Sequence, residues 1–171
     1  VQRAGVYVPG GLAAYPSSVV MNAVPALCAG VSTVAVTTPA SKDGTLPLPV
    51  LVALREVGVT QAYKIGGAAA VAALALGTES IPRVDVVAGP GNRFVNEAKR
   101  QLWGTVGLDG YAGPSEVCVL VDGTSNARFA AADLLTQIEH APDNAGFLVS
   151  TDEAKLGEVL AEIESQIEYA P

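Results

Sequence analysis

Short runs of apolar residues alternate along the chain with longer stretches in which apolar positions recur every three or four residues. The short runs are rich in valine, as is typical of buried strands, and glycine or proline follows several of them. The predicted strands are Val6–Val8, Val34–Val36, Ala62–Ile65, Val84–Ala88, Val117–Val121 and Phe147–Ser150. The predicted helices are Val19–Leu27, Val50–Val57, Ala68–Leu76, Phe94–Trp103, Asn126–His140 and a last helix that follows Thr151. This alternation predicts an α/β fold: a Rossmann-like open parallel sheet flanked by helices on both faces.

Local signals refine several of these elements. Ser17 or Ser18 is expected to cap the first helix, and Thr151 the last one. The first helix is apolar on nearly every side, which predicts that it is buried among other elements. Residues 107–111 are expected to form a loop.

A domain boundary is predicted near residues 113–116, where the strand–helix alternation restarts after a Gly-Pro turn. Residues 1–115 would form one Rossmann-like domain. Residues 116–171 would form part of a second Rossmann-like domain, a βαβα unit without its remaining strands. The chain begins without methionine in what the pattern predicts to be a strand, so we interpret it as an internal fragment of a longer protein.

Composition narrows the class of partner. The chain has 171 residues and a formal net charge of −7, with no basic run, so a nucleic-acid partner is not expected. Its longest apolar run, around Val71–Leu76, is far too short to span a bilayer, and no signal peptide is visible. We expect a cytoplasmic protein that binds a small molecule. Cys28 and Cys118 lie in separate apolar runs and are expected to be reduced core residues.

Three glycine turns follow predicted strands, at Gly10-Gly11, Gly66-Gly67 and Gly89-Pro90-Gly91. In an open parallel sheet such turns share the edge where ligands bind, and glycine lets the main chain approach a pyrophosphate. None of them matches GxGxxG or a P-loop, so the alternative that they only make tight turns stays open. Tyr7 and Asn92 stand beside them as candidate ligand contacts. The cations that follow Asn92, namely Arg93, Lys99 and Arg100, are expected to form a solvated helix face.

The end of the Asn126–His140 helix carries the other candidate chemistry. Gln137 and His140 are three residues apart, so both project from one face of its last turn, and His140 is the only histidine. A carboxamide oxygen and an imidazole nitrogen form half of a divalent-metal or polar-substrate site, but His140 can equally cap the last carbonyls. Ser115 follows a Gly-Pro turn that does not match the GxSxG elbow, so a substrate contact fits it better than a nucleophilic role.

Several motifs together resemble the histidinol dehydrogenase family over essentially the whole chain, in the family's order. They are Gln2–Gly11, Gly66–Ala68, Ala73–Glu79, Gly89–Asn92, Glu97–Gln101, Ala112–Glu116 and Asp133–His140. The family oxidises L-histidinol to L-histidine through the aldehyde in two NAD-dependent steps, with one bound zinc ion. The resemblance implies that Gln137 and His140 are zinc ligands that also border the substrate, that Ser115 contacts the substrate, and that Tyr7 and Asn92 contact NAD. Residues 1–115 would then be the NAD-binding domain.

The resemblance also implies an interlocked homodimer. The family's Glu-His acid/base pair and its other two zinc ligands would lie beyond Pro171, so this chain alone should be catalytically silent. Ala69 replaces a glutamine that usually touches NAD, and Ile138 and Ala141 replace the usual Ala and Gly. These departures leave two alternatives: a divergent member that oxidises another small alcohol, such as a sulfonated diol, or a non-catalytic nucleotide-binding fragment.

Overall fold

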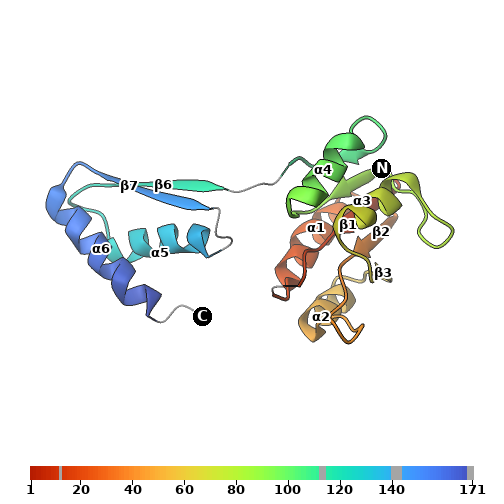
Figure 1. Cartoon of the computed structure of the whole chain (residues 1–171), viewed down its shortest axis with the longest axis horizontal. Coiled ribbons are helices and arrows are strands. Elements are labelled where there is room, and N and C mark those ends of the chain that lie inside the picture. The colour runs from red at the N-terminus through yellow and green to blue at the C-terminus, as the bar shows by residue number, and fades with distance from the viewer. Residues whose placement is uncertain (12, 112–114, 140–143, 169–171) are drawn as a thin grey trace. The chain divides into compact units, whose positions relative to one another are not determined.

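The computed structural model describes residues 1–11, 13–111, 115–139 and 144–168. Two units pack separately, residues 1–113 and 114–171, and each is described here by itself (Figure 1). The sequence pattern had suggested a division after residue 115.

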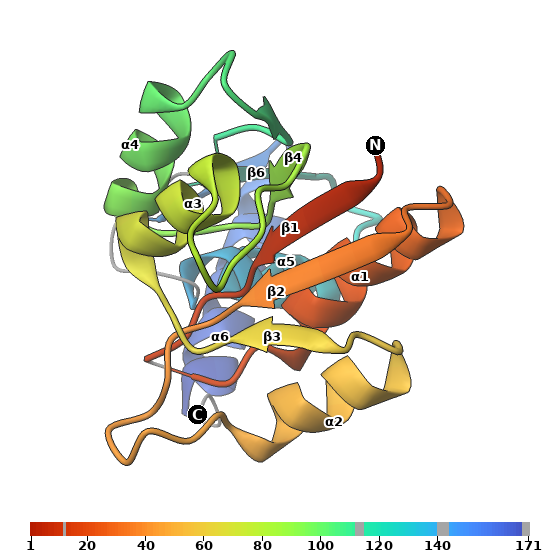
Figure 2. The same cartoon turned by 90° about the vertical axis from the view of Figure 1, so that its right-hand side faces the viewer.

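Unit 1 is an open sheet of parallel strands in the order β3-β2-β1-β4-β5. Figure 2 shows β3, β2, β1 and β4 side by side. The strands are β1 (Arg3–Tyr7), β2 (Thr33–Thr37), β3 (Gln61–Tyr63), β4 (Val86–Ala88) and β5 (Gly107–Leu108). The helices are α1 (Pro16–Cys28), α2 (Leu48–Glu56), α3 (Gly67–Leu76) and α4 (Arg93–Gln101). The strand order reverses between β1 and β4, which makes this a doubly wound sheet with a topological switch point. The predicted fold class is confirmed.

Two cores form because side chains alternate between the faces of each strand. On one face Val6 and Val36 pack with Val19 of α1 and Leu54 of α2. On the other face Tyr7, Ala35 and Val87 pack with α3 and α4, whose buried side chains include Ala70, Val71, Leu74 and Val95. Figure 2 shows α1 and α2 on one side of the sheet and α3 and α4 on the other.

Helix α1 differs from its prediction in two ways. It begins at Pro16, whose fixed φ suits the first turn, and no side chain caps it. Its only buried residues are Val19 and Ala23, whereas Met21 is 73% exposed. The predicted serine cap and the predicted burial on nearly every side are therefore both wrong for unit 1 as described, because α1 packs through a single stripe.

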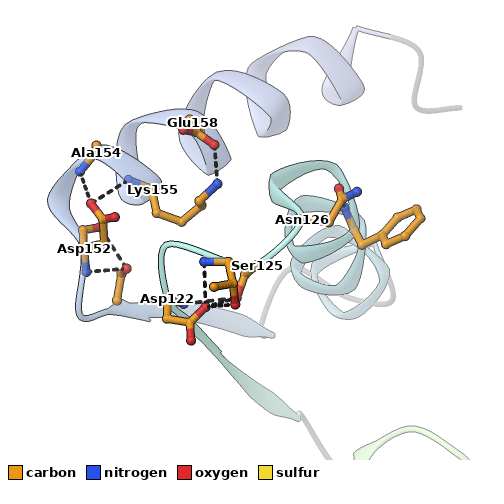
Figure 3. Close-up of polar contacts among 10 residues, drawn as sticks. Asp122, Ser125, Asn126, Asp152, Ala154, Lys155 and Glu158 are labelled. Carbon is orange, nitrogen blue, oxygen red and sulfur yellow. Dashed lines mark hydrogen bonds and ion pairs between the residues drawn. The ribbon is translucent and has the colours of Figure 1, made fainter.

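Unit 2 pairs β6 (Glu116–Val121) in parallel with β7 (Ala145–Ser150). Helices α5 (Ala127–Ile138) and α6 (Glu153–Ile167) pack on it through an apolar cluster: Val121, Ala130, Ala131, Leu134 and Val159. Polar caps stabilise the connections (Figure 3). Asp122 accepts hydrogen bonds from Thr124 and Ser125 in the turn after β6. Asp152, not the predicted Thr151, caps α6 by accepting from the backbone N–H groups of Ala154 and Lys155.

Three further expectations are corrected. Cys28 and Cys118 are free thiols, but both are exposed, because each points away from its unit's apolar cluster. Residues 107–108, expected in a loop, form the edge strand β5 through pairing with β4. Lys99, expected on a solvated face, is fully buried. Within the described residues, no helix is long and apolar enough to cross a membrane.

Candidate functional site

The turns after β1 and β4 meet at the switch point of the unit 1 sheet. Gly89, directly after β4, has φ +118°, and a Cβ atom there would lie 2.1 Å from the carbonyl oxygen of Tyr7. Only glycine allows so close an approach of two main chains. The carboxyl edge at a switch point is where open α/β sheets bind ligands. Tyr7 and Asn92, predicted as ligand contacts, belong to the two segments that meet here.

Tyr7 is the last residue of β1 and is 4% exposed. Its ring packs in the core beneath α3 and α4, and its phenol oxygen accepts a hydrogen bond of 3.1 Å from the backbone N–H of Gly67. Gly67 is the first residue of α3 and has φ +67°, with open space where a Cβ would stand. Tyr7 therefore holds the start of α3 at the carboxyl edge. The N-cap residue, Gly66, has no side chain that could cap α3, so the N–H groups that follow Gly67 in the first turn are available to an anion.

Asn92 caps α4. Its side-chain oxygen accepts from the backbone N–H groups of Phe94 (3.0 Å) and Val95 (3.1 Å). Asn92 is therefore the N-cap that the sequence offered as the alternative to a ligand contact, and the residue is exposed. The cap satisfies two donors that an anion would otherwise use, which makes α3 the more open of the two helix starts.

The Pro39 side chain packs closely against the glycine turns at Gly10 and Gly66. A Cβ atom at Gly10 would lie 2.8 Å from the Pro39 side chain, and one at Gly66 would lie 2.7 Å from it. Pro39 follows β2, so the connections after β1, β2 and β3 pack against one another at the carboxyl edge. Close packing against Pro39 therefore requires glycine at both positions.

An ion pair between a buried lysine and an exposed aspartate holds the turn after β4. The Lys99 ammonium contacts the Asp109 carboxylate at 2.7 Å, and its side chain is 0% exposed, whereas that of Asp109 is 38% exposed. Lys99 also donates to the carbonyl of Gly89 at 2.7 Å. Sequence reasoning missed both residues. Helical spacing could have indicated that Lys99 is buried, because it lies four residues after the buried Val95 on the same face of α4.

In unit 2 Asn144 links two of the predicted site residues, Ser115 and Gln137. The side-chain oxygen of Asn144 accepts from the backbone N–H of Ser115 at 2.9 Å, and its side-chain nitrogen donates to the carbonyl of Gln137 at 3.0 Å. Ser115 precedes β6, Asn144 precedes β7, and Gln137 lies in the last turn of α5. These residues therefore lie at the amino edge of the parallel pair, opposite to the edge where such sheets usually bind ligands.

The predicted metal site falls partly outside the structure. His140 and Ala141 are not among the described residues. Gln137 is half-buried, and its side-chain amide makes no hydrogen bond to another described residue. Over residues 1–11, 13–111, 115–139 and 144–168, no group of three or more His, Cys, Asp and Glu side chains is arranged to hold a metal ion. The described residues alone therefore do not form a zinc site, because Gln137 would supply a single ligand.

The fold and the switch-point turns define a doubly wound α/β protein of the Rossmann-like class. The sequence model of one family, described as histidinol dehydrogenase, matches residues 1–171. The chain belongs to the histidinol dehydrogenase family, as the motif resemblance predicted.

Curated relatives and a solved structure agree with this assignment. The histidinol dehydrogenases of a Synechococcus strain and of Bacillus licheniformis are each 53% identical over 171 residues, which is 100% of this chain and 39% and 40% of those proteins. The crystal structure of histidinol dehydrogenase from Elizabethkingia anophelis matches 98% of this chain and 39% of that one, with a TM-score of 0.93 and 40% identity. The chain thus spans about two fifths of the length of these relatives.

Proposed function

We propose that the protein takes part in the NAD-dependent, zinc-assisted oxidation of L-histidinol to L-histidine in histidine biosynthesis. The observation that carries this proposal is the family match over all 171 residues, with curated histidinol dehydrogenases at 53% identity. The chain would supply the NAD-binding unit and part of the substrate-binding unit. Because it spans about two fifths of its relatives, we propose that turnover needs the full-length protein.

The carboxyl edge of unit 1 fits a dinucleotide. Helix α3 starts there without a side-chain cap, and open space lies beside Gly11 and Gly67, both at positive φ. Free N–H groups at a helix start and an unobstructed main chain suit a pyrophosphate. When bound, NAD accepts the hydride that leaves the alcohol carbon. The residues of this chain would bind and orient it: Gly67 and α3 on one side of the switch point, and Asn92 on the other.

The substrate would lie against unit 2 through Ser115 and Gln137, with His140 as a second zinc ligand. This part of the proposal rests on the motif resemblance. What the structure contributes is the link through Asn144, which sets the backbone of Ser115 relative to the last turn of α5. A homodimer in the cytoplasm, as in the family, is proposed on the same basis.

The test is NADH formation from L-histidinol by the full-length protein with zinc present. Samples without histidinol and samples treated with a chelator are the controls. We expect NADH only in the complete mixture. In parallel, titration calorimetry with NAD should show binding to this chain alone, and titration with zinc should show no tight binding. NADH formed from histidinol after complete chelation would contradict the zinc assignment.

Two departures from the family pattern bear on a divergent member as a second candidate. Ala69 lies exposed in the first turn of α3, at a position where the family usually has glutamine. That departure concerns the cofactor. Ile138, the last residue of α5, departs from the family pattern on the side that the resemblance gives to the substrate. No NADH from histidinol but NADH from a sulfonated diol would establish this alternative. NAD binding without turnover of any alcohol by the full-length protein would indicate the non-catalytic alternative.

A further inference from the structure

The turn that follows β4 is held by a charged pair, Lys99 and Asp109. Gly89 is buried, and both of its main-chain polar groups are engaged by side chains from elsewhere in unit 1. Its N–H donates to one carboxylate oxygen of Asp109 at 2.7 Å. Its carbonyl accepts from the Lys99 ammonium at 2.7 Å. The same ammonium contacts the other carboxylate oxygen of Asp109, which closes a ring through the ion pair.

The Lys99 ammonium has no donor left for a ligand. An ammonium carries three N–H donors, and its acceptors here are the Gly89 carbonyl, Asp109 and, at 3.3 Å, the Gly110 carbonyl. With its side chain 0% exposed, Lys99 cannot contact a phosphate at the sheet edge without dismantling this arrangement. This geometry excludes direct binding of a phosphate by Lys99. Lys99 can therefore affect a ligand only through the position of Gly89.

The position of Gly89 controls the geometry of the switch point. The turn passes directly over the Tyr7 carbonyl, so there is no room for it to move toward β1. Lys99 on α4 and Asp109 after β5 hold the Gly89 peptide from the other side, and their hydrogen bonds oppose its movement away from β1. Three residues further on, Asn92 caps α4. The pair therefore fixes where α4 starts relative to Tyr7 and α3.

We infer that Lys99 and Asp109 are positioning residues for the cofactor: their ion pair holds the Gly89 peptide so that the switch-point edge is preformed for a dinucleotide. This inference rests on the proposed NAD-binding function. When the edge is preformed, NAD binding carries no entropic cost for ordering the turn. Loss of the pair should therefore weaken NAD binding more than it lowers the stability of the fold.

Single substitutions cannot separate these effects, because each leaves one charge unpaired, and for Asp109→Asn that charge is a buried ammonium. The decisive variant is Lys99→Met with Asp109→Asn, which removes both charges and keeps an acceptor for the Gly89 N–H. The matched control is Arg100→Met, which removes the neighbouring ion pair of α4, between Arg100 and Glu97, on its exposed face.

The experiment measures NAD affinity by calorimetry, thermal midpoint, and hydrogen exchange of the Gly89 amide, all on this chain. We expect the double variant to keep a cooperative transition near that of the parent chain. It should bind NAD at least tenfold more weakly and exchange the Gly89 amide at least tenfold faster. Arg100→Met should match the parent in affinity and exchange.

Two failures are distinguishable. If the parent chain binds NAD and the double variant binds it equally well, the inference is wrong and the proposed function stands. If the parent chain does not bind NAD, the proposed NAD-binding function is contradicted, and the inference with it. A double variant that fails to fold would show that the pair is needed for folding itself, and this result would also overturn the inference.

Discussion

The phenol oxygen of Tyr7 accepts a hydrogen bond from the backbone N–H of Gly67, which joins the last residue of β1 to the first residue of α3. The two residues are sixty positions apart in sequence. One side chain thereby sets the start of a helix at the sheet edge that we propose to bind NAD.

Replacing Tyr7 by Phe removes that hydrogen bond and keeps the buried ring. We expect the free energy of unfolding to fall by about 1 kcal/mol, the usual net value of such a bond. Urea unfolding measures this loss. Tyr63→Phe is the matched control, since the Tyr63 ring packs on the same core and its hydroxyl has no hydrogen-bond partner within the described part of the chain. Equal losses in the two variants would contradict the role given to Tyr7.

Gly89→Ala should be among the most damaging single changes in unit 1. The new Cβ would stand 2.1 Å from the Tyr7 carbonyl oxygen, at a backbone φ of +118° that favours glycine. We expect a loss above about 3 kcal/mol, or failure to fold, because overlap adds to backbone strain. Gly11→Ala separates the two effects: φ is +102° there, but nothing lies within 4 Å, so about 1–2 kcal/mol from strain is expected. Similar thermal midpoints for Gly89→Ala and Gly11→Ala would contradict the close approach between Gly89 and the Tyr7 carbonyl oxygen.

Asp85 should make unit 1 sensitive to acid. Hydrogen bonds from the backbone N–H groups of Arg3 and Gln2 hold the pKa of this carboxyl below its ordinary value of 3.8. Because the folded pKa is the lower one, the stabilisation is fully present above the unfolded pKa. It is lost as pH falls from there through the folded pKa.

Asp85→Asn should therefore lower stability at neutral pH and flatten the decline in stability below about pH 4. Thermal midpoints over a pH series measure both effects. Glu79→Gln is the control, since Glu79 is exposed and makes no hydrogen bond to another described residue. A decline that is equally steep in the parent chain and in Asp85→Asn would rule out Asp85 as a source of the acid sensitivity.

Asn144→Ala should loosen the amino edge of unit 2. The substitution frees the backbone N–H of Ser115 and leaves the Gln137 carbonyl without its side-chain donor. We expect faster hydrogen exchange at Ser115 and unchanged exchange in α6. Gln166→Ala is the matched control, because it also removes a bond from a side chain to a backbone carbonyl in unit 2, that of Arg128. Unchanged exchange at Ser115 in Asn144→Ala would show that Asn144 does not hold this edge.

Residues whose environment depends on distant partners were hard to predict. Lys99 was placed on a solvated face because lysine is usually exposed, yet it is buried against Asp109 and two carbonyls that lie ten or more residues away. Asn144 attracted no prediction, since its two partners belong to other elements. The ligand roles of Tyr7, Asn92, Ser115, Gln137 and His140 stay predictions.

The order and type of the elements other than β5 could be predicted from the sequence, because the period of the apolar residues and the glycine and proline stops are local properties. Motifs in the right order also identified the family. Three features became visible only once the chain was folded: the order of the strands, the contact between the turns after β1 and β4, and the position of Gly89 between Lys99 and Asp109. Those features arise from contacts between residues far apart in the chain, and no local pattern encodes a partner's position.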